Sequence, residues 1–146
     1  MKPFRLHAVL NYRQQLEDTA RQDLHHALEL ERKLHQSIRE AEEDLQSRFL
    51  EIQRNKETGT TVDWLLLLEY QIDLLKEKLT ALHDELRQQQ AQVTVKQQQL
   101  IKTSQDRKIM EKLQEQQNSA YARYLEKKEL IMLDEIAVLS HARRKR

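Results

Sequence analysis

The sequence contains no cysteine, one glycine and one proline among its 146 residues. The lack of cysteine excludes disulfide bonds, thiolate catalysis and cysteine-based zinc sites. Average usage would place roughly 10 glycines and 7 prolines in a chain of this length, so very few turns are available. Aromatic residues make up only 5% of the chain, whereas strands favour aromatic and β-branched side chains. These shortages argue against all-β and α/β folds.

The sequence also lacks a long hydrophobic run. Its longest apolar stretch, Leu65 to Leu68, lies between Asp63 and Glu69, and it is far shorter than the roughly 20 residues that span a bilayer. The N-terminal residues have no apolar core of the kind found in secretory signals. Acidic and basic residues nearly balance, at 24 against 25, so bulk charge favours neither nucleic acid nor an anionic membrane. We therefore expect a soluble, intracellular protein.

Strong helix formers dominate the sequence, and 34% of the residues are charged, which is typical of long helices and coiled coils. The one clear interruption is residues 55–61, which combine the single glycine with Asn and three Thr, a composition typical of turns. We predict an all-α fold, an antiparallel two-helix coiled coil (α-hairpin) whose second helix is longer than the first. The expected single domain, 1–146, comprises helix one over about 4–54, a loop over about 55–61, helix two over about 62–140 and a basic tail at 141–146.

A heptad pattern supports the prediction of two packed helices. In each helix, mostly apolar side chains recur at alternating spacings of three and four residues, and they form the stripe, here called the seam, through which one helix packs on the other. The first seam, in which Glu31 and Arg48 are polar layers, otherwise holds Ala20, Leu24, Ala27, Leu34, Ile38, Ala41, Leu45 and Ile52. The second seam consists of Leu65, Leu68, Ile72, Leu75, Leu79, Leu82, Leu86, Gln89, Val93, Lys96 and Leu100.

Helix two is expected to be uneven along its length. Its seam weakens at Gln89 and Lys96, which predicts a softer middle that allows bending. If the chain folds back around Gly59, residue i lies near residue 117 − i, so that Leu34 faces His83. Residues from about 116 onward then have no partner in the chain, and their apolar side chains are available to another protein. Beyond the Gln-rich stretch at residues 88–99, the apolar phase is expected to shift, to Ile109, Leu113, Ala120 and Tyr124 and then to Leu130, Leu133 and Ala137.

Catalytic chemistry finds no support in the sequence. One glycine cannot form a phosphate-binding loop or a nucleophile elbow. His25 and Glu29 have the i, i+4 spacing of a helical metal site, but one helix face does not complete such a site. A two-helix coiled coil also offers no enclosed pocket that would shift the pKa of a carboxyl group. We expect a protein that is not an enzyme, with no catalytic residue, no cofactor and no metal.

Two local features have more than one interpretation. The basic cluster at residues 141–146 has no interleaved aromatic residue, which argues against nucleic acid as a partner. A solvated tail is favoured there over contact with an acidic protein surface or an anionic lipid. Trp64 either closes the end of the seam or belongs to a partner-binding surface together with Leu66, Leu67, Tyr70 and Leu74.

Both ends of the chain carry recognisable patterns. The N-terminal part reads Phe4-Arg5-Leu6, Val9-Leu10, Tyr12-Arg13, Leu16-Glu17 and Ala20. The C-terminal part has Glu129-Leu130 and then Leu133-Asp134-Glu135-Ile136-Ala137, followed by the basic tail. Together with the length, the mid-chain loop and the apolar start of helix two, these patterns resemble the FliJ family of flagellar export proteins over nearly the whole chain.

The resemblance implies a soluble component of the flagellar type III export apparatus, folded like the central stalk of rotary ATPases. It implies that the joined helix ends insert into the hexameric export ATPase through Phe4, Leu6, Val9, Leu10, Arg13, Leu133, Asp134, Glu135 and Ile136. The hairpin tip would contact the cytoplasmic domain of the export gate, a membrane protein, through Trp64, Leu67, Tyr70 and Leu74. It also implies the escorting of export chaperones, a cytoplasmic location at the inner membrane of the flagellar base, and peripheral membrane association only.

Two other functions fit the same sequence. The coiled-coil stalk of a virulence type III secretion system has the same architecture, and only the terminal patterns favour the flagellar family. A free-standing coiled-coil scaffold or holdase would have no ATPase partner, and it would bury its free helix end by dimerising.

Overall fold

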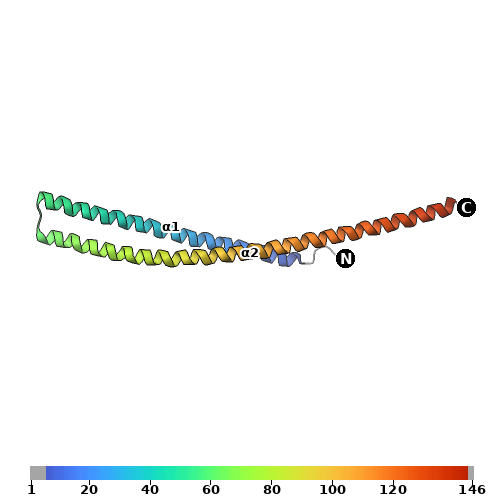
Figure 1. The fold of residues 1–146 in the computed structure, drawn as a ribbon, viewed down its shortest axis with the longest axis horizontal. Helices are drawn as coiled ribbons and strands as arrows, with labels where there is room; N and C mark the ends of the chain where they lie inside the picture. The colour runs from blue at the N-terminus through green and yellow to red at the C-terminus, as the bar shows by residue number, and fades with distance from the viewer. Residues whose placement is uncertain (1–5, 145–146) are drawn as a thin grey trace. The chain divides into compact units, whose positions relative to one another are not determined.

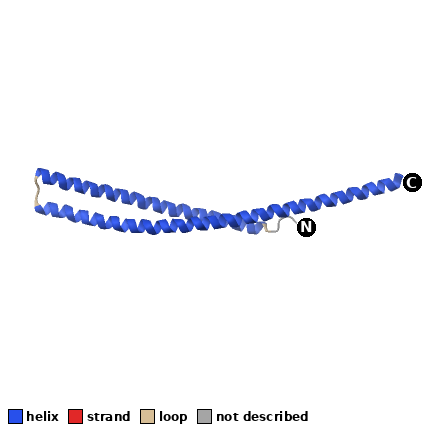
Figure 2. Cartoon of the chain, in the orientation of Figure 1, coloured by secondary structure: helices blue, strands red, loops and turns tan. Residues whose placement is uncertain are grey.

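The fold is an α-hairpin, as predicted. A computed structural model describes residues 6–144, and within them α1 covers His7–Thr58 and α2 covers Val62–Arg144. Figures 1 and 2 show the two helices joined by one short connection, and no strand occurs in the described part of the chain. The expected helical start at residue 4 lies outside the described residues.

The turn is tighter than the sequence suggested. The first helix continues past its expected end at residue 54, and Thr58 Oγ1 donates a hydrogen bond of 2.9 Å to the Arg54 carbonyl in the last turn. Gly59 follows with φ of 89°, a left-handed conformation that glycine adopts freely and that commonly ends a helix. Thr61 then caps α2, because the Trp64 N–H donates to its Oγ1 at 3.2 Å.

The far end of α2 also differs from the prediction. The helix does not stop at residue 140 but continues to Arg144, so residues 141–144 of the expected tail are helical. His141, Arg143 and Arg144 lie in the last turn. Basic side chains are favourable there because the C-terminal end of a helix carries a partial negative charge.

The contacts divide the chain into two units. The first unit consists of residues 20–100, and the second consists of residues 1–19 together with residues 101–146. Each unit contains a part of both helices. The single domain over 1–146 stays a prediction.

In the unit of residues 20–100, the predicted seams are confirmed. Every predicted seam position on both helices is buried or half-buried, including the polar layers Glu31 and Arg48. Leu68 and Ala41 are each only 1% exposed. Small side chains on α1 let the helices approach closely at several layers. The buried apolar residues of this unit are Ala20, Ala27, Ile38, Ala41, Leu68, Ile72, Leu86 and Val93.

The pairing of the two helices near Leu34 differs from the predicted one. Leu34 lines a groove with Glu85 and Gln89 and does not face His83, which is exposed. The prediction placed the turn at residues 55–61, whereas the structure places it after Thr58.

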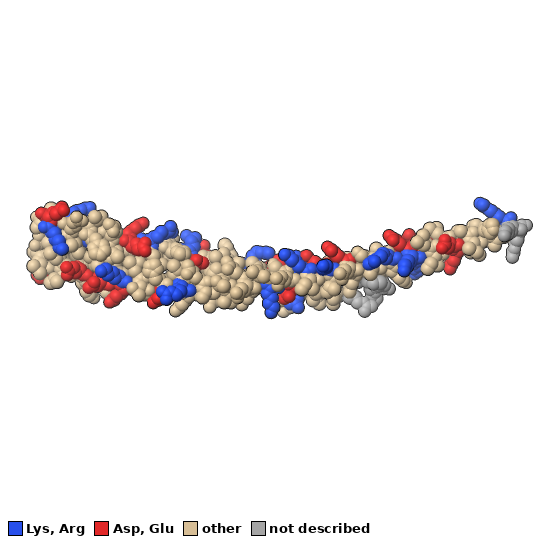
Figure 3. Space-filling model, in the orientation of Figure 1, with Lys and Arg blue, Asp and Glu red and all other residues tan. Residues whose placement is uncertain are grey.

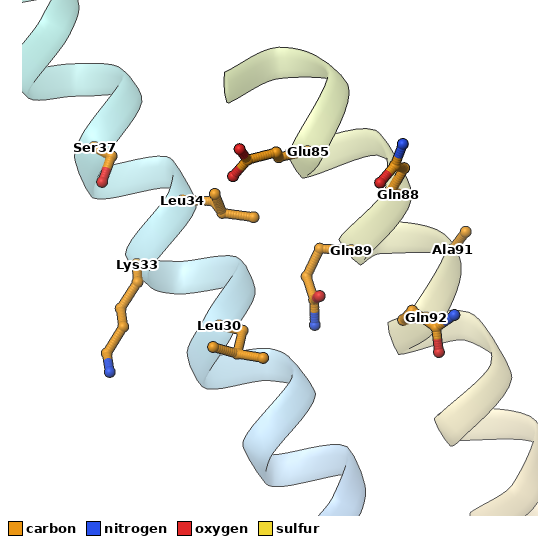
Figure 4. A pocket seen from close by; sticks show the side chains of 9 residues that line it. All are labelled: Leu30, Lys33, Leu34, Ser37, Glu85, Gln88, Gln89, Ala91 and Gln92. Atoms are coloured by element: carbon orange, nitrogen blue, oxygen red, sulfur yellow. The ribbon is translucent and has the colours of Figure 1, made fainter. Parts of the chain in front are cut away.

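The middle of this unit contains the expected polar layer. The Gln89 side chain lies between the helices (Figure 4). Its Nε2 donates a hydrogen bond of 3.0 Å to the Ala27 carbonyl. The groove beside it holds about 720 Å³ and is lined by Leu30 and Leu34 from α1. An amide therefore occupies a seam position where a leucine would pack.

Changing Gln89 to Leu is expected to raise the free energy of unfolding by about 1 kcal/mol, because the gain in apolar burial exceeds the loss of one partly exposed hydrogen bond. Urea denaturation followed by circular dichroism measures this difference. The control is Q88L, since Gln88 is exposed and lies outside the seam. Equal stability of Q89L and the wild type would contradict the role of Gln89 as a weak layer.

In the second unit, the expected phase shift is wrong. The less exposed positions of α2 continue the same alternation of three and four residues beyond Leu100, whereas Ile109 is 58% exposed and Leu113 39% exposed. On α1 the seam likewise runs through Arg13 and Glu17 and leaves Val9 exposed. The seam residues that α2 contributes here are Thr103, Arg107, Met110, Gln114, Gln117 and Tyr121.

Candidate functional site

The C-terminal part of α2 exposes many large apolar side chains. All residues from 122 to 144, which we call the arm, are exposed, so the uncovered segment begins a little later than the predicted residue 116. Leu133 is 61% exposed and Ile136 is 56% exposed. The other large apolar side chains of the arm are Tyr124, Leu125, Leu130, Ile131, Met132, Val138 and Leu139.

The apolar side chains of the arm point in all directions around the helix. Successive residues of an α-helix are rotated by about 100°, so the four consecutive residues from Leu130 to Leu133 cover its whole circumference. Within residues 130–139, the only charged residues are Asp134 and Glu135. A helix that is hydrophobic all round is normally buried on every side. This one is bare, so a partner that encloses it would cover more apolar area than one that lies along a single face.

The residues predicted to face the ATPase form two separate groups. Leu133, Asp134, Glu135 and Ile136 are exposed on the arm. Of the N-terminal residues, Leu6 and Val9 are exposed, and Leu10 is 5% exposed and packs in the seam. Phe4 lies outside the described residues. The remaining residue, Arg13, forms an ion pair of 3.6 Å with Asp106.

These two groups are well apart along α2. Arg13 lies opposite Asp106, and the helix rises by 1.5 Å per residue, so Leu133 lies about 40 Å further along its axis. The sequence placed both groups at one joined end. Of these two groups, only the one on the arm has every member exposed.

The residues predicted to face the export gate are all exposed side chains outside the seam. Leu67, Tyr70 and Leu74 have the i, i+3 and i+7 spacing that aligns side chains along one face of α2. Trp64 is 42% exposed and precedes the seam residue Leu65. Part of its surface is therefore available to a partner. We call Trp64, Leu67, Tyr70 and Leu74 the tip surface.

Two exposed residues of α1 were missed by the sequence analysis. Phe49 is 43% exposed and Leu50 is 44% exposed. The Phe49 ring lies 5.8 Å from Lys76 Nζ on α2, within the range of a cation–π interaction. The sequence could have indicated their exposure, because they follow the seam residue Arg48 directly. Only two positions in each heptad face the other helix, so the residues next to Arg48 lie outside the seam.

Charged side chains of both signs are interspersed on the face that Figure 3 shows. Several ion pairs between described residues join side chains of the same helix, as Arg32 and Glu29 do at 2.7 Å. The hydrogen bond from Arg32 lowers the pKa of Glu29. Arg32 therefore occupies the Glu29 carboxylate, which was the carboxylate of the candidate His25–Glu29 metal site.

Metal-binding groups and membrane-spanning segments can be searched for only in the described residues. Among the described residues, no group of three or more His, Asp or Glu side chains is arranged to hold a metal ion. Within the same residues, neither helix contains a stretch long and apolar enough to cross a membrane. The best candidates for function are therefore the two exposed apolar surfaces, the arm and the tip surface.

Comparisons with known proteins identify one relationship. The family model described as "Flagellar FliJ protein" matches residues 1–146, which is the whole chain. No curated protein matches the sequence, and no solved structure matches the fold.

Proposed function

The chain belongs to the flagellar FliJ family and is a flagellar export-related protein, and from this premise we propose that it acts as a stalk for the hexameric export ATPase. The arm is the segment that enters the ATPase ring. The tip surface contacts the cytoplasmic domain of the export gate. The protein acts in the cytoplasm at the inner membrane of the flagellar base, and its association with the membrane is peripheral. Escorting of export chaperones belongs to the same proposal.

One observation carries the ATPase part of this proposal. Residues 130–139 expose apolar side chains around the whole helix, and burying such surface is worth about 25 cal/mol per Å². A groove on a partner covers one face of a helix, whereas the inside of a ring covers every face. The arm therefore fits a central opening better than it fits a flat or grooved surface.

This arrangement requires no catalytic group on the chain. A helix held inside a ring of identical subunits contacts them unequally, because one helix lacks their symmetry. Binding energy that differs between subunit conformations shifts their equilibrium. Stimulation of ATP hydrolysis follows from stabilising the assembled ring and its active conformations.

The test is ATP hydrolysis by the export ATPase with and without the chain, together with co-sedimentation of the two proteins. We expect the chain to stimulate hydrolysis and to sediment with the ATPase. Absence of both effects would overturn the stalk proposal and favour the self-associating scaffold. Sedimentation equilibrium of the chain alone would then detect a dimer that covers the arm.

The gate part of the proposal makes its own prediction. Changing Trp64 and Tyr70 to Ala is expected to weaken binding to the cytoplasmic domain of the export gate by at least about tenfold, because buried Trp and Tyr side chains dominate protein interfaces. Isothermal titration calorimetry measures the affinity. The L133A/I136A variant is the matched control and should bind the gate domain normally. Equal loss in both variants would exclude the tip surface as a separate site.

A further inference from the structure

The N-terminal segment of α1, residues 7–19, packs on α2 through an unusually polar seam. In the unit that contains it, the buried residues of the described part are one apolar residue, Leu10, and one acidic residue, Glu17. The unit of residues 20–100, by contrast, buries eight apolar side chains. Apolar burial therefore contributes little to holding the N-terminal segment in place.

Ion pairs supply the specific contacts in this segment. Arg107 Nε donates to Glu17 Oε2 at 2.6 Å, and Arg107 Nη1 donates to Glu111 Oε1 at 2.6 Å. The Glu17 side chain is 7% exposed and that of Arg107 is 21% exposed. The more exposed pair of Arg13 and Asp106 adds a contact of 3.6 Å. Arg107 thus joins a buried carboxylate on α1 to a second carboxylate on its own helix.

A buried carboxylate that loses a cationic partner retains its desolvation cost. Removing one member of a buried ion pair is strongly destabilising, whereas replacing both members by apolar side chains is often neutral or stabilising. Residues 7–19 are also the N-terminal part of α1, and the ends of helices open locally at a low free-energy cost. Release from α2 would therefore unfold the N-terminal segment locally, while the apolar seam of the other unit holds its own helices together.

We propose that residues 7–19 form a releasable segment whose attachment to α2 is controlled by Arg107. Release uncovers α2 from about residue 101 onward and so lengthens the helix that a partner can enclose. The use of that extra length by an ATPase ring rests on the proposed function. The release itself does not, and it is a property of the chain alone.

Hydrogen exchange followed by mass spectrometry tests the release in the full chain without any partner. The R107Q variant is expected to exchange the amides of residues 11–19 at least about tenfold faster than the wild type, while those of residues 27–41 keep their protection. The matched control is R32Q, which removes an exposed ion pair within α1 and should leave both segments unchanged. The rescue variant is E17L/R107L, which should restore protection of residues 11–19.

Three results would overturn the proposal. R107Q could accelerate exchange equally in both segments, which would show that the ion pair stabilises the hairpin as a whole. R107Q could leave exchange unchanged. The wild type could exchange residues 11–19 at the rate of an unprotected chain, which would mean that nothing holds the segment. Since no ATPase is present, none of these results bears on the stalk proposal.

Discussion

Changing Leu133 and Ile136 together to Ala is expected to weaken binding to the export ATPase by at least about 100-fold. At a protein concentration at which the wild type gives maximal stimulation of ATP hydrolysis, the variant should give none. Each side chain contributes roughly 1.5 to 3 kcal/mol when it is fully buried in a complex. Both are exposed in the free chain, so the melting temperature should not change. Titration of ATPase activity with the variant measures the loss.

The matched control for this variant is L28A/V95A. Leu28 and Val95 are each 43% exposed, lie in the unit of residues 20–100, and belong neither to the arm nor to the tip surface. This control should stimulate the ATPase as the wild type does. Full stimulation by L133A/I136A, or equal loss in the control, would show that the arm does not make the contact.

Changing Leu68 to Ala is expected to lower the free energy of unfolding by about 2 to 4 kcal/mol. Leu68 is the largest side chain that is fully buried among the described residues, at 1% exposed, and removing a buried leucine side chain loses its transfer free energy and leaves a cavity. Two helices alone have little other core to compensate. Urea denaturation monitored by circular dichroism measures the change.

The neighbouring residue provides the control for this prediction. Leu67 is 45% exposed and lies on the tip surface, so L67A should change the free energy of unfolding by no more than about 0.5 kcal/mol. L68A changes a seam residue, whereas L67A changes the preceding residue, which lies outside the seam. Similar destabilisation by both substitutions would contradict the assigned seam.

The two surfaces were accessible to sequence analysis to different degrees. The arm follows from the unequal lengths of the helices, because residues beyond the start of α1 have nothing to pack against. The tip residues follow from counting, since a seam accepts only two positions in seven and leaves residues such as Leu67 and Tyr70 outside. The sequence could not show that Leu10 is buried and that Arg13 is engaged by Asp106. Those contacts depend on which residues of α2 lie opposite.

The sequence by itself determined the helices, their seams between residues 20 and 100 and the existence of one turn. These features are local: helix propensity, three-four spacing and a single glycine each act over a few residues. The position of the turn after Thr58, and with it the register, was decided by how far α1 continues.

Only the tertiary structure decided that the seam keeps its phase beyond Leu100. The apolar residues Ile109 and Leu113 suggested a shift, yet they lie outside the seam and Arg107 lies within it. A change of seam face would require α2 to rewind locally, because a regular α-helix keeps one residue spacing along its length. At one of the polar seam positions, Arg107 is paired across the helices with Glu17.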